Sequence, residues 1–155
     1  MRPEDIAGYR AVKAALSIPI AGGECEFTRF GFRDLFVSRA LDVAQPDTGG
    51  AGGLSECKKI ADMAETFGIR YIPHVSGTGV AIAASLHLLA VLPPHTPPSL
   101  RPIAPVLELD RTEDPIRQAV LAEPIEHVRG VVRVPSGSGL GIEVDRKALA
   151  KFAVR

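Results

Sequence analysis

The sequence predicts an α/β fold in which parallel strands alternate with helices, as in one half of a β/α barrel. Each of four predicted strands ends at a polar residue, and these residues are Glu24, Asp47, His74 and Glu108, spaced 23, 27 and 34 residues apart. A complete barrel takes about 250 residues, or roughly 31 per unit, so 155 residues suffice for about half of one. An open doubly wound sheet would also place polar groups at strand ends, but this regular spacing favours the barrel.

The first helix is predicted from the spacing of its apolar residues. Residues 3–16 carry apolar side chains at helical intervals, namely Ile6, Tyr9, Val12 and Leu16. Residues 17–21 form a short apolar run that ends at two glycines and Glu24, which predicts a strand leading into a loop. The apolar residues within 32–36 then mark the second helix.

The second and third strands enclose another predicted helix. Residues 41–45 form the second strand, which ends just before Asp47, and residues 69–72 form the third, which ends just before His74. Between them, a glycine-rich turn leads into a helix whose buried face is predicted to hold Leu54, Ile60, Met63, Ala64 and Phe67. Gly68 is expected to end this helix in the left-handed conformation.

The remaining residues predict a fourth unit and a tail. Residues 78–92 form an apolar helix stopped by the proline tract 93–99, and residues 105–109 form the fourth strand. After Asp110 the pattern predicts a short helix or turn at 111–120, a strand at 130–134 and a last helix from Asp145. No flexible polar linker interrupts the chain. We therefore expect residues 1–110 to form the β/α units and residues 111–155 a closing C-terminal extension of the same domain.

Composition excludes several classes of protein. The chain has 18 basic and 18 acidic side chains, so it lacks the positive charge that nucleic-acid binding requires, and we expect no nucleic-acid partner. The longest apolar stretch, residues 80–92, is too short to span a bilayer and contains Ser85 and His87, so no membrane partner is expected. No secretory signal opens the chain, and Cys25 and Cys57 are too few for a disulfide framework. These features predict a cytoplasmic protein.

The polar strand ends suggest chemistry but also allow simpler interpretations. Glu24 follows two glycines and could be an oxygen ligand for Mg²⁺, or equally a loop side chain in water. Asp47 and His74 follow adjacent strands and could pair, which would fix the imidazole tautomer and make His74 a general base. Taken without further context, a histidine that caps the next helix beside an unrelated aspartate is the simpler interpretation.

Several motifs, taken in order, resemble one family. They are IPIAGGE at 18–24, QPD at 45–47, GGLSE at 52–56, YIPHVSGTGVAIAASLHL at 71–88, LELD at 107–110 and VPSGSGLGIEVD at 134–145. Together they resemble the mandelate racemase subgroup of the enolase superfamily, within the mandelate racemase and muconate lactonizing enzyme family. The segment GGECEFTRFGFRDL at 22–35 resembles members that act on sugar acids or their lactones, including aldarolactone cycloisomerases.

This resemblance implies a fold, a reaction and four site residues. The family fold is a modified β/α barrel with a separate N-terminal capping domain, so the chain corresponds to the C-terminal barrel half alone. The family reaction removes the proton α to a carboxylate while Mg²⁺ holds the enediolate. By position, Glu24 matches a carboxylate ligand of Mg²⁺, and His74 matches the acid/base that Asp47 orients. Glu108 matches an acidic residue that hydrogen-bonds the substrate carboxylate. Superfamily sites pair a Lys or His base with Mg²⁺ because carbon acids are weak and the enediolate needs electrostatic stabilisation.

The chain departs from the family pattern in two places. Family members commonly carry a basic residue between QPD and GGL, where this sequence has residues 48–51, TGGA. The family's first two metal carboxylates, its Lys-x-Lys pair and its capping domain all precede IPIAGGE, and only 17 residues do so here. One carboxylate alone does not hold Mg²⁺ tightly. We therefore expect any catalytic site to be incomplete in this chain alone.

Two functions follow as expectations. In the first, the chain performs Mg²⁺-dependent α-proton abstraction from a sugar acid or its lactone, as a dehydratase, cycloisomerase or racemase. In the second, it is a non-catalytic truncated remnant or a half-barrel assembly module. In both cases, unpaired strand edges predict self-association or a partner that supplies the missing barrel half.

Overall fold

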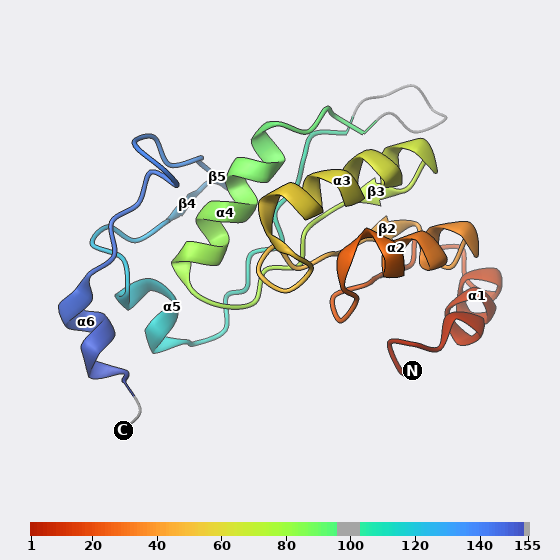
Figure 1. The fold of residues 1–155 in the computed structure, drawn as a ribbon, viewed down its shortest axis with the longest axis horizontal. Coiled ribbons are helices and arrows are strands. Elements are labelled where there is room, and N and C mark those ends of the chain that lie inside the picture. Colours follow the sequence, from red (N-terminus) through yellow and green to blue (C-terminus); the bar gives the residue numbers. More distant parts are fainter. Residues whose placement is uncertain (96–102, 154–155) are drawn as a thin grey trace.

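The computed structural model describes residues 1–95 and 103–153, and its elements alternate as the sequence predicts (Figure 1). In chain order the helices and strands are α1 (Ile6–Ala15), β1 (Ala21–Gly22), α2 (Thr28–Val37), β2 (Val43–Ala44), α3 (Gly53–Thr66), β3 (Arg70–Tyr71), α4 (Gly79–Ala90), α5 (Pro115–Ala119), β4 (His127–Val128), β5 (Val131–Val132) and α6 (Arg146–Lys151). The proline tract at 93–99 was predicted to stop α4. Residues 96–99 of this tract lie outside the described residues.

The first three strands form a parallel sheet in the order β1-β2-β3. Ala21 pairs with Val43, and Val43 pairs in turn with Arg70. One further parallel bridge joins Asp47 to His74, so the pairing of β2 and β3 resumes where the candidate site residues lie. Each pair of neighbouring strands is connected through a helix, which confirms the predicted series of parallel β/α units.

The main core lies between this sheet and its helices. Phe32 and Phe36 of α2 are fully buried, and they pack with Ile60 of α3 and with apolar residues of the strands. Helix α2 packs against α3, and α3 against α4, in the succession that Figure 1 shows. The prediction for Leu54 was wrong, because this residue lies in the first turn of α3 and is exposed. In the described part of the chain, no helix is long and apolar enough to cross a membrane.

Gly68 follows α3 in the left-handed region, with φ of 69°, as predicted for the residue that ends this helix. A side chain is strained at such an angle, whereas glycine adopts it freely. The turn brings the chain directly from α3 into β3. It therefore sets the direction in which the strand leading to His74 begins.

The predicted fourth strand was wrong. Residues 105–109 lie within the described range but form no strand. Pro105 has no N–H with which to join a ladder of backbone hydrogen bonds. The segment still lies where a strand of the unit would, because Leu107 and Leu109 pack against a second cluster formed by Val75, Ile82 and Leu86. Burial of its alternate apolar residues, and not strand pairing, positions it.

The described residues after Asp110 contain two short helices and a hairpin. The predicted strand at 130–134 is confirmed as β5, which pairs antiparallel with β4. The last helix begins where predicted, because the Asp145 side chain accepts hydrogen bonds from Lys147 N and Ala148 N. The blue end of the chain in Figure 1 carries α6, which lies beside α5 at the opposite end of the molecule from α1.

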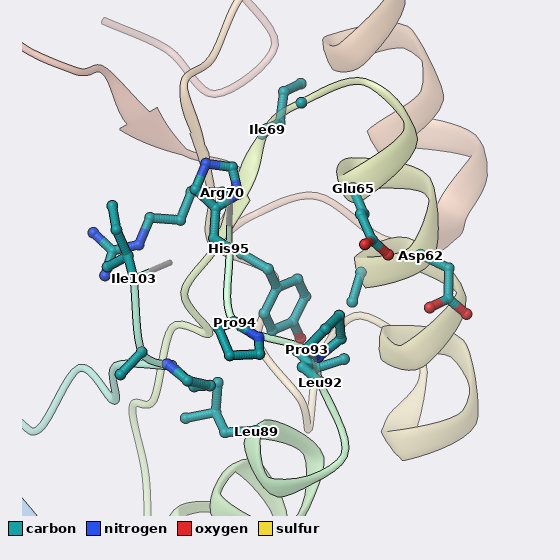
Figure 2. A pocket seen from close by; sticks show the side chains of 15 residues that line it. Asp62, Glu65, Ile69, Arg70, Leu89, Leu92, Pro93, Pro94, His95 and Ile103 are labelled. Atoms are coloured by element: carbon teal, nitrogen blue, oxygen red, sulfur yellow. The ribbon is translucent and has the colours of Figure 1, made fainter. Parts of the chain in front are cut away.

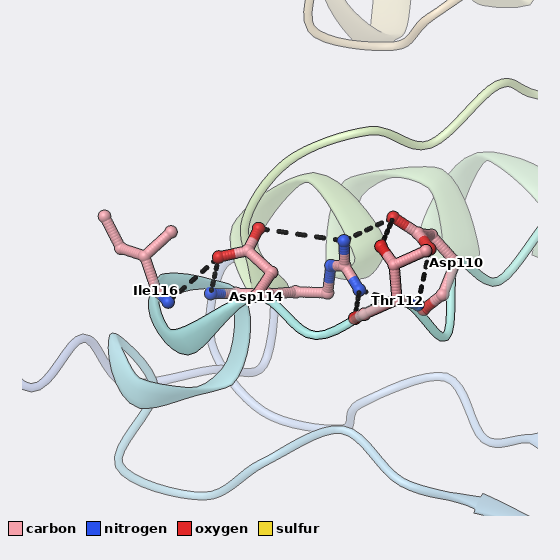
Figure 3. A network of polar contacts seen from close by, with 5 residues as sticks. Asp110, Thr112, Asp114 and Ile116 are labelled. Atoms are coloured by element: carbon pink, nitrogen blue, oxygen red, sulfur yellow. Dashed lines mark hydrogen bonds and ion pairs between the residues drawn. The ribbon is translucent and has the colours of Figure 1, made fainter.

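A buried arginine, Arg117, joins α5 to the segment before it through a polar network that includes Asp110, Thr112 and Asp114 (Figure 3). Arg117 of α5 is only 8% exposed and forms an ion pair with Asp110, and it also donates to the carbonyls of Asp110 and Thr112. The pKa of Asp110 is lowered from its ordinary value of 3.8, first by hydrogen bonds from the backbone N–H and hydroxyl of Thr112, and then by Arg117. The network thereby fixes the end of the 105–109 segment.

Replacing Arg117 with alanine is expected to lower the thermal midpoint at neutral pH by about 3–6 °C, because the carboxylates of Asp110 and Asp114 both lose their ion-pair partner. A depressed pKa in the folded state stabilises the fold above the ordinary value of 3.8, and this stabilisation is lost as the pH falls through the folded-state pKa. The difference between Arg117→Ala and the parent should therefore shrink in acid. Thermal unfolding followed by circular dichroism checks this. The control is Arg33→Ala, which breaks an exposed ion pair with Asp34 and should leave the midpoint unchanged.

Candidate active site

Three of the four predicted site residues converge at the carboxyl ends of the parallel strands. Glu24 follows β1, Asp47 follows β2 and His74 follows β3. The Nδ1 atom of His74 lies 3.0 Å from Oδ2 of Asp47, and its Nε2 atom lies 3.6 Å from Oε2 of Glu24. The imidazole therefore lies between a carboxylate of the adjacent strand and one of the strand beyond it. The contact between Asp47 and His74, which the sequence left open, is present.

This contact determines which ring nitrogen of His74 faces outward. A carboxylate only accepts hydrogen bonds, so the nitrogen beside Asp47 is the one that carries hydrogen. In the neutral ring, Nε2 then holds the free lone pair. The side chains of His74 and Asp47 are 21% and 19% exposed, so the pair is largely shielded while one face stays accessible. The arrangement can accept a proton at Nε2 and hold the resulting charge beside Asp47.

The loop after Asp47 holds the second oxygen of its carboxylate. Oδ1 accepts hydrogen bonds from Gly49 N at 2.7 Å and Gly50 N at 2.8 Å. The Asp47 carbonyl accepts another from Ala51 N at 2.7 Å. A Cβ atom on Gly49 would lie 3.2 Å from Oδ1, which is a tight contact, so glycine permits the close approach. Backbone amides thus orient the carboxylate in a loop that contains no basic side chain.

Two glycines position Glu24. Gly23 has φ of 104°, and a Cβ atom there would lie 2.6 Å from the ring of Phe32. A Cβ atom on Gly22 would lie 2.9 Å from the ring of Tyr9. Only glycine fits both requirements, so the chain turns sharply over the core and projects Glu24 outward. The Glu24 side chain is 56% exposed and turns one oxygen towards His74.

Glu108 contacts a residue outside the group formed by Glu24, Asp47 and His74. Its Oε2 atom accepts a hydrogen bond of 2.6 Å from Nε2 of Gln45. Gln45 lies two positions before Asp47, so both side chains leave the same side of the extended chain. Gln45 was not among the predicted site residues, although it belongs to the QPD motif at 45–47. Period-two alternation with Asp47 was the signal that could have marked it as a site residue.

A buried thiol lies beneath Asp47. Cys57 of α3 is fully buried, and its Sγ atom lies 3.8 Å from the Asp47 carbonyl, to which it donates a weak hydrogen bond. The pKa of Cys57 is raised to about 11, mainly by burial; a hydrogen bond with Tyr71 lowers it in part, and the nearby carboxylates of Asp47 and Glu56 add to the rise. Cys25, next to Glu24, is exposed. The two thiols therefore differ strongly in reactivity.

We expect iodoacetamide at neutral pH to modify Cys25 and to leave Cys57 intact, because the thiolate is the reactive form and burial suppresses it. Intact mass spectrometry should show one adduct on the native chain and two after unfolding in concentrated guanidinium chloride. Native Cys25→Ser should show none. Rapid double labelling of the native parent would contradict the packing described around Asp47.

The described residues do not form a magnesium site by themselves. Across residues 1–95 and 103–153, no group of three His, Cys, Asp or Glu side chains is arranged to hold a metal ion. Glu24 has the chemistry and exposure of a magnesium ligand, but Asp47 is occupied by His74 and by loop amides. Magnesium requires several oxygen ligands in an octahedron. Among the described residues, Glu24 is a carboxylate that such a site could use, and a complete set of ligands is not present.

A cavity elsewhere in the chain is unrelated to this constellation (Figure 2). It has a volume of about 130 Å³ and lies between the end of α3, β3 and the segment after α4. Asp62, Glu65 and Arg70 contribute charged side chains to its lining. None of the four predicted site residues lines it. Glu24, Asp47 and His74 therefore lie at the carboxyl ends of the strands and not in this cavity.

Comparison with known proteins identifies relatives across nearly the whole chain. The profile of the family described as enolase C-terminal domain-like matches residues 1–148. The chain is 49% identical over 150 residues to D-galactarolactone cycloisomerase of Agrobacterium fabrum, covering 97% of this chain and 39% of that protein. It is 34% identical over 129 residues to arabinonate dehydratase of Saccharolobus solfataricus, covering 83% of this chain and 32% of that protein.

Solved structures give the same result. The crystal structure of 3,6-anhydro-D-galactonate cycloisomerase from Zobellia galactanivorans matches with a TM-score of 0.88 and 41% identity, over all of this chain and 41% of that one. A mandelate racemase/muconate lactonizing enzyme-like protein from Rubrobacter xylanophilus matches with a TM-score of 0.80 and 31% identity, over 97% of this chain and 36% of that one.

These matches confirm the α/β barrel-half fold that the sequence predicted, and the chain spans between 32% and 41% of the length of the four relatives named above. Its three-dimensional structure agrees with those of the two solved relatives. The chain belongs to the enolase C-terminal domain-like family, among the proteins related to mandelate racemase and muconate lactonizing enzyme.

Proposed function

We propose that the chain supplies the acid/base half of an enzyme that removes the α-proton from a sugar acid or its lactone. The observation that carries this proposal is the hydrogen bond between Asp47 and His74, which leaves Nε2 of the imidazole free beside Glu24. The names of the relatives support the substrate class, since they include a galactarolactone cycloisomerase and an arabinonate dehydratase. Dehydration, cycloisomerisation and racemisation all begin with this proton abstraction.

Each site residue has a proposed role. His74 accepts the α-proton at Nε2, and Asp47 holds the ring in the reactive tautomer and stabilises its positive charge. Glu24 is one ligand of Mg²⁺, an ion that stabilises the negative charge developing on a substrate carboxylate. Glu108, held by Gln45, contacts the substrate carboxylate. The remaining magnesium ligands would come from outside the described residues.

The proposed enzyme needs more of the barrel than this chain contributes. Within the described residues, β1 pairs only with β2, so its outer edge is open to another strand. We propose that a second copy, a partner chain or a longer form of this chain supplies the rest of the barrel. Residues 1–110 would then form the β/α units that join it, with residues 111–155 closing the domain. The cytoplasmic location stays a prediction.

An alternative function is that of a half-barrel assembly module without catalysis. A wide apolar groove favours this alternative. It has a volume of about 760 Å³ and lies between α4, the 105–109 segment and the β4–β5 hairpin. Val106 and Val131 line it and are 43% and 61% exposed. Exposed apolar surface of this kind is typical of an interaction site.

Exchange of the substrate α-proton distinguishes the two functions. The chain is incubated with Mg²⁺ in D₂O, with a panel of aldarates, aldonates and their lactones, and exchange is followed by NMR. A parallel sample adds, as a separate polypeptide, the part of the Agrobacterium fabrum cycloisomerase that this chain does not match. Exchange that disappears on removal of Mg²⁺ and in His74→Ala supports the enzyme. Absence of exchange in both samples contradicts it and favours the assembly module.

A further inference from the structure

A pair of buried hydroxyl groups lies next to the catalytic pair. Thr48 follows Asp47 directly and is 3% exposed, and Ser85 of α4 is 1% exposed. Their oxygen atoms, Oγ1 of Thr48 and Oγ of Ser85, lie 2.9 Å apart in a hydrogen bond. Neither residue is part of the proposed proton-transfer machinery. Both are far too buried to meet a substrate.

This bond differs from the other hydrogen bonds of the Asp47 loop in that it reaches α4, whereas Thr28 N of α2 donates to the Ala51 carbonyl and Cys57 Sγ of α3 donates to the Asp47 carbonyl. The hydrogen bonds to Gly49, Gly50 and Ala51 all close within the loop, so they fix its shape. They do not fix its place relative to the imidazole. The bond from Thr48 leaves the loop and reaches across 37 residues to α4. Because α4 begins at Gly79, shortly after His74, it connects the two segments that carry the catalytic pair.

The first turn of α4 is itself held in place. A Cβ atom on Gly79 would lie 2.3 Å from the Leu121 side chain, so the helix start packs directly against the C-terminal extension. Ile82 and Leu86, on the same helix, pack with Val75, which is the residue after His74. Helix α4 is therefore a fixed reference for the imidazole. A directional bond from this helix to the Asp47 loop sets the spacing between carboxylate and ring.

An apolar pair of similar size would fill this space without needing a hydrogen bond. Replacing both partners of a buried hydrogen bond with apolar groups of the same shape is often nearly neutral for stability. What the two hydroxyls add is direction, since a hydrogen bond specifies the distance and angle between its atoms. Since the loop has no basic side chain to anchor Asp47, the bond to Ser85 is its side-chain connection to the helix that follows His74.

We propose that Thr48 and Ser85 are positioning residues that hold Asp47 at hydrogen-bonding distance from His74. The proposal rests on the function proposed above, in which this pair transfers the proton. It assigns the two hydroxyls a role in the reaction geometry that goes beyond filling the core. It also explains how this chain fixes its aspartate through a TGGA loop.

The test observes the Asp47–His74 hydrogen bond directly, in the 155-residue chain and without substrate. Labelling with ¹⁵N-histidine makes the Nδ1–H group of His74 visible by NMR, and its rate of exchange with water reports how well Asp47 protects it. The variant is Thr48→Val with Ser85→Ala, which removes both hydroxyls and leaves no buried donor unpaired. The Nε2–H of His87, donated to the Leu140 carbonyl at 3.0 Å, is an internal reference.

Two further variants separate positioning from general loosening. Thr48→Ser keeps the hydroxyl and loses only a methyl group, so it should preserve the His74 signal. Ser38→Ala removes a hydroxyl that donates only to the Leu35 carbonyl of its own helix, at 2.9 Å, and serves as the matched control. Chemical unfolding of each variant shows whether its overall stability has changed.

We expect the double variant to increase His74 Nδ1–H exchange about fivefold or more, the factor that one net hydrogen bond represents, with the His87 signal unchanged. Thr48→Ser and Ser38→Ala should match the parent. Unchanged exchange in a folded double variant would overturn the proposal. If the double variant fails to fold, Ser85→Ala alone decides the question in the same measurement, since it removes a single oxygen atom.

A second measurement separates this proposal from the proposed function. In the α-proton exchange assay, the double variant should lower kcat about fivefold with little change in KM, because substrate does not touch either hydroxyl. A change in the NMR signal with no activity in any sample would retain the positioning role and reject the enzyme. Activity without any change in the NMR signal would reject the positioning role and retain the enzyme.

Discussion

Replacing His74 with asparagine is expected to lower the rate of α-proton exchange by about 10²–10⁴-fold, the usual contribution of a general base. Asparagine has a similar size and hydrogen-bonds Asp47, but it cannot accept a proton near neutral pH. Substrate contacts are left in place, so the loss should fall on kcat and not on KM. NMR in D₂O, on the sample in which the parent chain is active, measures this rate.

Two companion variants make the interpretation specific. Asp47→Asn should also lower the rate by more than about tenfold, because an amide no longer selects the tautomer with hydrogen on Nδ1. His127→Asn replaces an exposed histidine that contacts Arg111 at the far end of the chain, and it should leave the rate unchanged. Equal activity of His74→Asn and the parent would reject the assigned base.

Replacing Phe32 with alanine is expected to destabilise the chain by about 3–5 kcal/mol, the usual cost of removing a buried phenylalanine side chain. Phe32 is fully buried, and its ring lies against Phe36 with centroids 5.8 Å apart. The same ring also lies under Gly23, so its loss removes the support of the turn that projects Glu24. Urea unfolding followed by circular dichroism measures the free energy.

Phe30 provides a matched control for this variant. It lies on the same helix, α2, and is 60% exposed, with the Arg29 guanidinium 5.3 Å from the centre of its ring. Phe30→Ala should change the free energy of unfolding by no more than about 0.5 kcal/mol. If Phe32→Ala is too unstable to purify, Phe32→Leu should show a smaller loss in the same direction. Equal effects at the two phenylalanines would contradict the described burial.

The helices were the most predictable part of the fold. Helices α1, α3 and α4 lie within one to three residues of the predicted ends, because apolar periodicity, an αL glycine and capping groups are local signals. The burial of single residues was less predictable. Leu54 fits the helical period of α3, but it lies in the first turn and is 39% exposed. The apolar period predicts which face of a helix is buried. It does not predict how far along the helix neighbouring elements pack against that face.

The failure at 105–109 has a similar cause. Alternating apolar residues predict a strand, yet a strand also needs a neighbour with which to exchange backbone hydrogen bonds. Leu107 and Leu109 satisfy the burial pattern by packing against the Val75 cluster, while the ladder of hydrogen bonds is absent from this segment. The local sequence predicts which side chains of the segment face the core. It does not show whether a neighbouring strand is present to exchange backbone hydrogen bonds.

The sequence by itself determined the family, the alternation of elements and the residue types at the strand ends. These follow from local patterns and motif order, which are properties of the chain alone. Only the tertiary structure decided which of these residues meet. Parallel pairing at Asp47 and His74 brings two groups 27 residues apart to 3.0 Å, and leaves Glu108 with Gln45 instead. Such distances depend on the register and packing of separate units, which no local pattern encodes.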